Sequence, residues 1–294
     1  MGGFFVIELI VSDMDGTLLN NKLAVSDTNR EAIEYAERKG IKFMVATGRG
    51  YTEAVPALKE AGISCPMITV NGGQLFDEAG NLIANIGIDK ARIRRILDFV
   101  RSKGLYAEIV TTKGVFSDDK VGRIETMTTL LQTTNPDTTF KMALILALGR
   151  LELLNIHYVN HFDEVLDDDS SQMLKVLVFS NIGQPELQVI REEFETDEEL
   201  IITSSFFNNI EINHVEAQKG IAVERFAKEM GISMENVMTI GDNFNDASML
   251  KNAGVSFAMG NAEEGVKAIA KYVTSTNNEN GVADAIFRAI NEKL

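Results

Sequence analysis

The chain has 294 residues and a formal net charge of −15 at pH 7, and 45% of its residues are hydrophobic. The composition is that of a globular protein, and the length predicts two domains at about 150 residues each. Basic patches bind nucleic acids and anionic membranes, so the acidic balance excludes both as partners. The single cysteine, Cys65, cannot form an internal disulfide, which favours a reducing cytoplasm.

The N-terminal apolar run, Phe4–Val11, contains Glu8 and has no basic segment before it. It therefore predicts a buried strand and not a signal peptide. No other segment approaches the roughly 20 uncharged apolar residues of a membrane-spanning helix. The apolar run Met142–Leu148 is far too short. We expect a cytoplasmic protein that is a monomer or a weak homodimer.

The first part of the chain alternates predicted strands and helices. Residues 7–12 predict a strand that ends at Asp13. Ser26 offers an N-cap for the next helix, and Thr28 with Glu31 offers an overlapping capping box. Gly40 is placed to end that helix. Further along come a strand at 41–46, a helix that precedes Gly62 and a strand at 67–70.

The last part of the chain repeats this order. Its predicted elements are a helix at 221–230, a strand at 236–240, a helix carrying Met249 and Leu250, a strand at 255–259 and helices near 263–271 and 282–293. Continuous apolar strands separated by helices predict a parallel sheet covered on both faces. The fold class is therefore α/β, with a Rossmann-like, doubly wound parallel sheet as its core.

The middle of the chain, roughly 85–213, has a different composition, with acidic runs and Thr-rich segments. Leu174–Phe179 predicts an alternating strand, and Ile201–Ser205 with Asn208–Ile212 predicts a hairpin. We interpret this part as an inserted α+β domain. Residues 1–84 and 214–294 are then the two parts of the core, and residues 85–213 are the insertion.

Two aspartates, Asp13 and Asp15, follow directly after the first predicted strand. In open α/β sheets, ligands bind at the carboxyl ends of strands, so the pair lies where a site is expected. Two acids one residue apart can divide the chemistry between a nucleophile and a proton donor. Gly16 lets the backbone turn away from the strand. A strand-terminating turn is the alternative, because Asp and Gly also favour turns.

Three further polar groups stand at corresponding places. Thr47-Gly48-Arg49 follows a buried strand, where a hydroxyl and backbone N–H groups can hold phosphate oxygens. Lys219 opens a helix, against the preference of the helix dipole for acids there, which suggests that it faces an anion. The segment 241–246, with Asp242, Asn245 and Asp246, supplies oxygen ligands that suit Mg²⁺. Each group taken alone also has an ordinary structural explanation. These are a plain turn for residues 47–49, a solvated surface lysine for Lys219 and a helix-capping turn for residues 241–246.

Together the four groups resemble the motifs of the haloacid dehalogenase superfamily, in its Cof-type IIB subgroup. Residues 13–17 resemble motif I, Thr47-Gly48-Arg49 motif II, Lys219-Gly220 motif III and residues 241–246 motif IV. Ile68–Gly73 resembles the core-to-cap junction of the subgroup. The match covers nearly the whole chain. The set of four motifs is highly specific, whereas the cap sequence is not.

The resemblance implies a phosphatase that forms an aspartyl-phosphate. Asp13 would be the nucleophile and Asp15 the general acid/base. Mg²⁺ would be held by Asp13, the backbone carbonyl of Asp15, and Asp242, with Asp246 supporting the site. The phosphoryl group of a small phosphorylated metabolite would be held by Met14, Thr47, Gly48, Arg49, Lys219 and Asn245.

Two other functions stay open. A phosphosugar mutase uses the same acid pair but returns the phosphoryl group to its substrate, and product analysis separates it from a phosphatase. A phospho-ligand sensor keeps the fold without turnover, although the presence of Asp15 and Asp242 favours an enzyme. His157 and His161 are interpreted as an exposed helix face, because no acid of the metalloprotease pattern lies between them.

Overall fold

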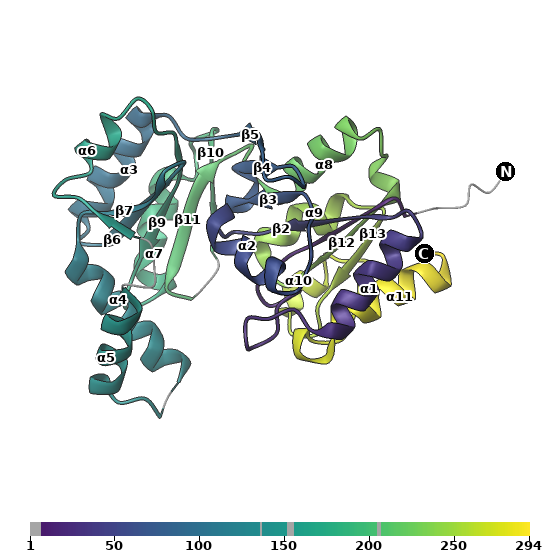
Figure 1. Ribbon diagram of the computed structural model, residues 1–294. Coiled ribbons are helices and arrows are strands. Elements are labelled where there is room, and N and C mark those ends of the chain that lie inside the picture. Colours follow the sequence, from purple (N-terminus) through teal and green to yellow (C-terminus); the bar gives the residue numbers. More distant parts are fainter. Residues whose placement is uncertain (1–6, 136, 152–155, 205–206) are drawn as a thin grey trace. The chain divides into compact units, whose positions relative to one another are not determined.

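A computed structural model describes residues 7–135, 137–151, 156–204 and 207–294. The chain forms two compact units, one of residues up to 86 together with 216–294, and one of residues 87–215 (Figure 1). Within the described ranges, no helix combines the length and the apolar character that crossing a membrane requires. Each unit has its own sheet and its own hydrophobic core.

The first unit contains an eight-stranded sheet in the order β14-β13-β12-β1-β2-β3-β4-β5. The strands β14 to β3 in this order are parallel, and β4 and β5 add an antiparallel edge. The strands are β1 (Leu9–Ser12), β2 (Lys42–Ala46), β3 (Met67–Thr69), β4 (Gln74–Phe76), β5 (Leu82–Asn85), β12 (Val237–Gly241), β13 (Val255–Ala258) and β14 (Tyr272–Val273). Residues 4–6 of the predicted first strand lie outside the described part of the chain.

Helices cover both faces of this sheet, as the doubly wound prediction requires. The helices are α1 (Asp27–Arg38), α2 (Tyr51–Glu60), α8 (Lys219–Glu229), α9 (Ala247–Asn252), α10 (Glu264–Lys267) and α11 (Gly281–Glu292), and 3-10 turns lie at 70–72, 234–236, 244–246 and 277–279. On β1, Ile10 packs with α1, α2 and α11, whereas Leu9 and Val11 pack with α8 and α9. Alternate side chains of a strand point to opposite faces, so both faces of the central strands are apolar.

The ends of α1 follow from its sequence. The Ser26 hydroxyl accepts a hydrogen bond from the backbone N–H of Asn29 at 3.1 Å and so caps the helix. The capping box predicted at Thr28 and Glu31 is wrong, because Thr28 already lies in the first turn. After the helix, Gly40 has a φ of +83°, which glycine adopts without steric penalty.

The second unit contains a six-stranded sheet in the order β10-β11-β9-β6-β7-β8. All neighbouring strands are antiparallel except β7 and β8. The strands are β6 (Tyr106–Thr111), β7 (Gly114–Ser117), β8 (Ile156–Tyr158), β9 (Met173–Phe179), β10 (Leu200–Thr203) and β11 (Asn209–His214). The predicted hairpin is confirmed by the β10–β11 pairing, although Ser205 lies outside the described residues.

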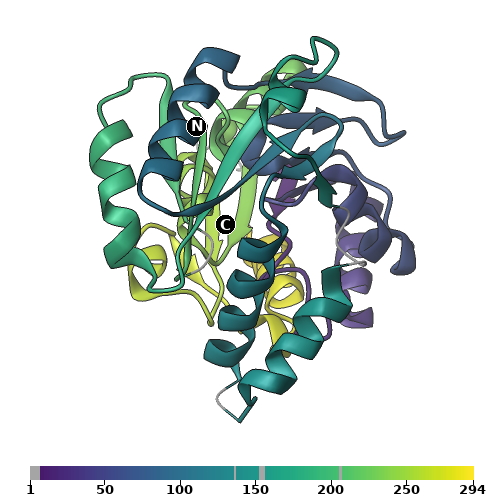
Figure 2. The same ribbon diagram turned by 90° about the vertical axis from the view of Figure 1, so that its left-hand side faces the viewer.

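In the described residues of the second unit, the helices are α3 (Lys90–Ser102), α4 (Lys120–Thr134), α5 (Phe140–Leu151), α6 (Asp163–Leu166) and α7 (Gln184–Phe194). The helices α3, α6 and α7 pack on the sheet through apolar residues such as Ile93, Val165 and Ile190. The helices α4 and α5 lie side by side and share a small cluster around Met127 and Ala143 (Figure 2). The α/β class with an α+β insertion is thus confirmed.

Three further local predictions are wrong. The strand β9 does not alternate along the whole of Leu174–Phe179: residues 173–176 are all buried, including Lys175, which pairs with Glu211 at 2.8 Å, and only residues 176–179 alternate between buried and partly buried. His157 lies in β8 and His161 precedes α6, so the two do not share a helix face. The chain passes from the first unit to the second between Ile86 and Gly87, so Ile68–Gly73, predicted as the core-to-cap junction, lies inside the first unit.

Asn29 provides a test of the first unit's packing. Its side chain is 1% exposed, donates to the Leu18 carbonyl at 3.4 Å and accepts from the Ala283 N–H at 3.0 Å. That N–H lies in the first turn of α11 and has no partner within its own helix. Asn29→Ala should lower the free energy of unfolding by about 1–3 kcal/mol, the cost of a buried unpaired group. Urea unfolding measures this loss.

The matched control is Asn252→Ala, which truncates an exposed asparagine at the end of α9. A surface substitution of this kind changes stability by at most about 0.5 kcal/mol. Equal midpoints for the two variants would show that Asn29 does not hold α11 to α1.

Candidate active site

Three neighbouring strands carry the polar residues of the site. Asp13 follows β1, Thr47 follows β2 and Asp242 follows β12, and these strands are adjacent in the order β12-β1-β2. Because the strands are parallel, their carboxyl ends meet at one edge of the sheet. Asp13 and Asp242, which are more than 200 residues apart in the sequence, are therefore brought together.

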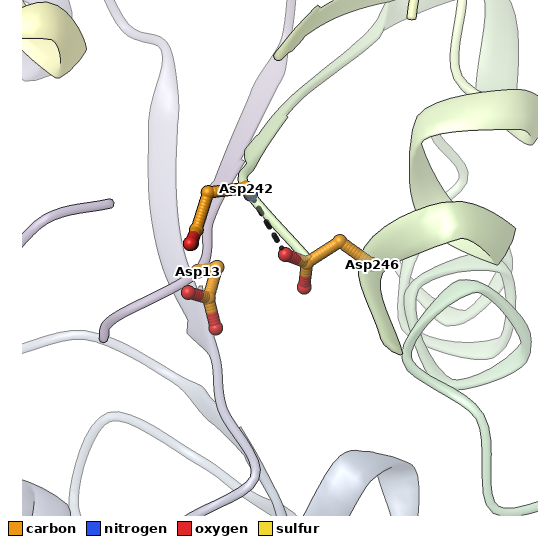
Figure 3. Close-up of side chains that lie close together, drawn as sticks. All are labelled: Asp13, Asp242 and Asp246. Carbon is orange, nitrogen blue, oxygen red and sulfur yellow. Dashed lines mark hydrogen bonds between the residues drawn. The ribbon is translucent and has the colours of Figure 1, made fainter. Parts of the chain in front are cut away.

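Three carboxylates meet at this edge (Figure 3). One oxygen from each of Asp13, Asp242 and Asp246 lies within 4.8 Å of the others. Asp246 also fixes its own loop, because its Oδ2 accepts from the backbone N–H groups of Asp242 at 2.9 Å and Asn243 at 3.1 Å. The Thr17 hydroxyl donates to Asp242 Oδ1 at 2.7 Å. Thr17 is thus part of the site, although the sequence analysis gave it no role.

Lys219 lies fully buried among these acids. Its Nζ donates to Asp13 Oδ1 at 2.5 Å and to Asp246 Oδ1 at 2.6 Å, and its side chain is 0% exposed. Lys219 is the first residue of α8, and the next residue, Gly220, packs against the backbone of Ser248 in α9. A Cβ at Gly220 would lie 2.5 Å from the Ser248 carbonyl carbon, so only glycine lets the two helices approach this closely.

Burial and mutual repulsion change the acidity of the cluster. Burial, followed by the charge of Asp246, raises the pKa of Asp13 well above its ordinary value, and the Lys219 ammonium opposes this only in part. The same two causes raise the pKa of Asp242 to about 6, against the Thr17 hydrogen bond. Burial alone would lower the pKa of Lys219, but Asp13 and Asp246 together raise it above its ordinary value. Lys219 is therefore a permanent cation.

The turn after β1 depends on a close approach. Gly16 has a φ of +77°, and a Cβ there would lie 2.4 Å from Asp242 Oδ2. The Gly16 carbonyl also accepts from Asn261 Nδ2 at 2.8 Å. A side chain at position 16 would be strained at this φ and would displace the Asp242 carboxylate, so glycine favours the close approach of motif I and Asp242.

Asp15 lies beside this cluster but outside it. Its carboxylate forms a two-point ion pair with Arg49, with Nε–Oδ2 at 2.7 Å and Nη2–Oδ1 at 2.5 Å. The side chain of Asp15 is 49% exposed, whereas that of Asp13 is 7% exposed. The two predicted catalytic acids thus occupy different environments, one paired and exposed to solvent, the other buried.

The other residues predicted to bind phosphate differ in which of their groups a ligand could reach. Thr47 is 1% exposed, and its hydroxyl accepts from the Arg49 N–H at 3.1 Å. A Cβ at Gly48 would lie 3.0 Å from Asn71 Oδ1 and 3.8 Å from Asn245 Nδ2, so the glycine adjoins both amides. The Met14 side chain is 0% exposed and packs in the core, so only its backbone is available to a ligand.

Asn245 leads to a residue that the sequence analysis did not assign to the site. Its Nδ2 donates to Asn71 Oδ1 at 3.2 Å, although the two lie 174 positions apart. Asn71 is 3% exposed. One signal for Asn71 is present in the sequence, the Asn-Gly-Gly segment after a predicted strand, which we assigned to a domain junction instead.

The chemistry of the donor set fits a divalent metal ion. Asp13, Asp242 and Asp246 present only oxygen atoms, and hard cations such as Mg²⁺ or Ca²⁺ take oxygen ligands. The carboxylate of Asp15 is not in this group, and the metal contact predicted for Asp15 was through its backbone carbonyl and not through its side chain. One ammonium, Lys219, does not balance three carboxylates, and a bound cation would.

Comparisons with known proteins agree with this geometry. A sequence model of the haloacid dehalogenase-like hydrolases matches residues 10–286. The phosphatase YwpJ of Bacillus subtilis is 34% identical over 280 residues, which covers 94% of this chain and 98% of YwpJ. The 5-amino-6-(5-phospho-D-ribitylamino)uracil phosphatase YwtE of the same bacterium is 32% identical, covering 94% of this chain and 96% of YwtE.

A solved structure agrees as well. A haloacid dehalogenase-like hydrolase from B. subtilis superimposes with a TM-score of 0.84 and 33% identity, over 95% of this chain and 99% of that one. The resemblance found from the motifs is thus confirmed over nearly the whole length. The chain belongs to the haloacid dehalogenase-like hydrolases, and its relatives within that family identify it as an enzyme of the phosphatase type.

Proposed function

We propose that the protein is a Mg²⁺-dependent phosphatase that hydrolyses a small phosphate monoester through an aspartyl-phosphate on Asp13. The observation that supports this most directly is the contact of the Lys219 ammonium with Asp13 at 2.5 Å, inside a group of three carboxylates. A carboxylate that attacks a phosphate dianion meets like-charge repulsion, so cations must lie beside it. Lys219 is such a cation.

In the first step, an oxygen of Asp13 attacks phosphorus, the Asp13–phosphorus bond forms and the bond to the leaving oxygen breaks. Asp15 gives its proton to that oxygen, which leaves as an alcohol. In the second step, a water molecule gives a proton to Asp15 and attacks phosphorus, which releases inorganic phosphate and restores both acids. Bound Mg²⁺ supplies charge neutralisation for the phosphoryl oxygens throughout.

The remaining residues bind the phosphoryl group or the metal ion, or hold the acid/base in position. Arg49 holds both oxygens of Asp15, which keeps that acid ionised, so Asp15 carries the proton for the leaving group once Arg49 exchanges this pair for a phosphate oxygen of the substrate. Thr47, Gly48 and Asn245 supply hydroxyl and N–H donors around the phosphoryl group. The backbone carbonyl of Asp15 completes the metal ligands. These roles follow from the resemblance and from the chemistry of each group.

We propose that the inserted unit, residues 87–215, is the cap that selects the substrate. The relatives' names include a phosphatase of a phosphoribitylamino-uracil, so a phosphorylated small metabolite is the substrate class. A screen of phosphate release with Mg²⁺ over sugar phosphates, nucleotides, flavin mononucleotide, pyridoxal phosphate and phosphoribitylamino-uracils tests the proposal. Release of phosphate in step with loss of ester supports a phosphatase, whereas isomerised ester without phosphate indicates a mutase.

Asp13→Asn should abolish hydrolysis, because an amide is neither a nucleophile nor an anionic metal ligand. Phosphate release should fall below a few per cent of the wild-type rate. Circular dichroism and thermal melting check that the variant is folded, since Lys219 still has Asp246 as a partner. A folded variant that retains substantial activity, with contamination excluded, would exclude Asp13 as the nucleophile.

Mg²⁺ should be required and Ca²⁺ should inhibit. Ca²⁺ takes more oxygen ligands at longer distances than Mg²⁺, so it can draw both oxygens of Asp13 into coordination and keep them from phosphorus. Activity measured after exhaustive chelation, and again after each ion is restored, checks both parts. Full activity of the chelated protein would contradict a metal requirement.

Asp15→Asn should lower turnover by roughly 10²–10⁴, the usual contribution of a positioned acid/base. The loss should be smaller on p-nitrophenyl phosphate than on an alkyl phosphate, because the nitrophenolate leaves without a proton. Single-turnover rates on the two esters measure the difference. An equal loss on both would argue against proton donation to the leaving group.

A further inference from the structure

A left-handed turn follows β3 at the edge of the site. Val70, Asn71 and Gly72 have consecutive positive φ values of 51°, 58° and 106°. A positive φ is unfavourable for a β-branched residue, and such conformations persist only where surrounding contacts impose them. The contacts of this turn should therefore show what the conformation is for.

Its backbone is bonded to motif II. The Val70 N–H donates to the Arg49 carbonyl at 2.9 Å, and the Asn71 N–H donates to the Thr47 carbonyl at 3.0 Å. These two carbonyls flank Gly48. The loop proposed to bind phosphate is thus held on both sides of its glycine by the turn.

The same turn packs against motif III. A Cβ at Gly72 would lie 2.6 Å from the Gln218 carbonyl oxygen and 2.9 Å from the Gln218 nitrogen. Gln218 is the residue that directly precedes Lys219 at the start of α8. The close approach is possible only because position 72 lacks a side chain, and it fixes the start of the helix that carries the lysine.

The Asn71 side chain connects the turn to motif IV. Its Oδ1 accepts one of the two N–H groups of Asn245 Nδ2 at 3.2 Å. An amide held in this way keeps its nitrogen toward Asn71, and the second N–H of that nitrogen can still serve an anion. Without the acceptor, the Asn245 amide can turn over and present its oxygen, which repels phosphate.

We propose that Asn71 is a positioning residue for phosphate binding, which acts by fixing the orientation of the Asn245 amide. The inference rests on the proposed function, since it assumes that the phosphoryl group binds at Asn245. The turn 70–72 then links three of the four motifs, because its backbone holds motif II and motif III while its side chain holds motif IV.

The test is the equilibrium affinity for inorganic phosphate in the presence of Mg²⁺, measured by calorimetry on the full-length protein. Asn71→Gly removes the side chain, and glycine adopts a φ of 58° without strain. The dissociation constant should rise roughly 10- to 100-fold, the effect of losing one hydrogen bond to a charged group. Asn245→Ala should give a similar rise.

The double variant separates a positioning role from an independent one. If Asn71 acts through Asn245, then Asn71→Gly in the Asn245→Ala background should change the affinity by no more than about twofold. Asn29→Ala is the matched control, because it also removes a buried asparagine from the first unit but has no contact with the phosphate-binding residues. It should lose stability and keep its phosphate affinity.

The outcomes distinguish the two proposals. Wild-type protein that binds no phosphate would overturn the proposed function and this inference together. Wild-type protein that binds phosphate and hydrolyses esters through Asp13, with unchanged affinity in Asn71→Gly, would overturn the inference alone. Losses that multiply in the double variant would also overturn it, because Asn71 would then act independently of Asn245.

Discussion

The buried ion pairs of Lys219 are the interaction on which the site depends. A charge with no exposure to water is stable only if partners replace its hydration, and Asp13 and Asp246 do so at 2.5 and 2.6 Å. With Asp242 added, three carboxylates face one ammonium and leave two negative charges when all are ionised. A divalent cation neutralises that remainder. The arrangement that explains the place of the lysine therefore also suits the divalent metal ion that we propose.

Close backbone approach is the second constraint on the site. Gly16 lies against Asp242, and a Cβ at Gly241 would lie 2.6 Å from the Cβ of Asp246. Gly220 and Gly72 allow the two neighbours of the lysine helix, α9 and the left-handed turn, to pack directly on it. Glycine at these four positions thus lets the segments around the site approach one another closely. The cost is conformational entropy, because a glycine loses more backbone freedom on folding than any other residue.

The sheet order explains why a large insertion leaves this site intact. The strand β1 lies between β2 and β12, so the chain builds the sheet outward from β1 in both directions. Ligand sites in such folds lie where the order reverses, outside the carboxyl ends of the strands. The insertion of residues 87–215 enters after β5 at the sheet's edge and returns before α8. The pairing of β1 with β12 is not interrupted.

The sequence by itself determined the fold class and the principal polar groups. The fold class was readable because the hydrophobic periods of strands and helices are local in the sequence. The polar groups were readable because they follow β1 and β12 or begin α8, and ligand sites of open α/β sheets lie at the carboxyl ends of strands. The N-cap Ser26 and the terminating Gly40 were also readable, because capping depends on a few consecutive residues. A highly specific set of four motifs then predicted the family.

Only the tertiary structure decided which of these groups touch. The pairing of Asp15 with Arg49, the hydrogen bond of Thr17 to Asp242 and the contact of Asn71 with Asn245 join segments 34, 225 and 174 positions apart. No local period carries such information, because side-chain contacts of this kind depend on how strands are ordered in the sheet. For the same reason the sequence assigned Asn71 to a domain junction, whereas the packing of its turn on motifs II, III and IV places it in the site.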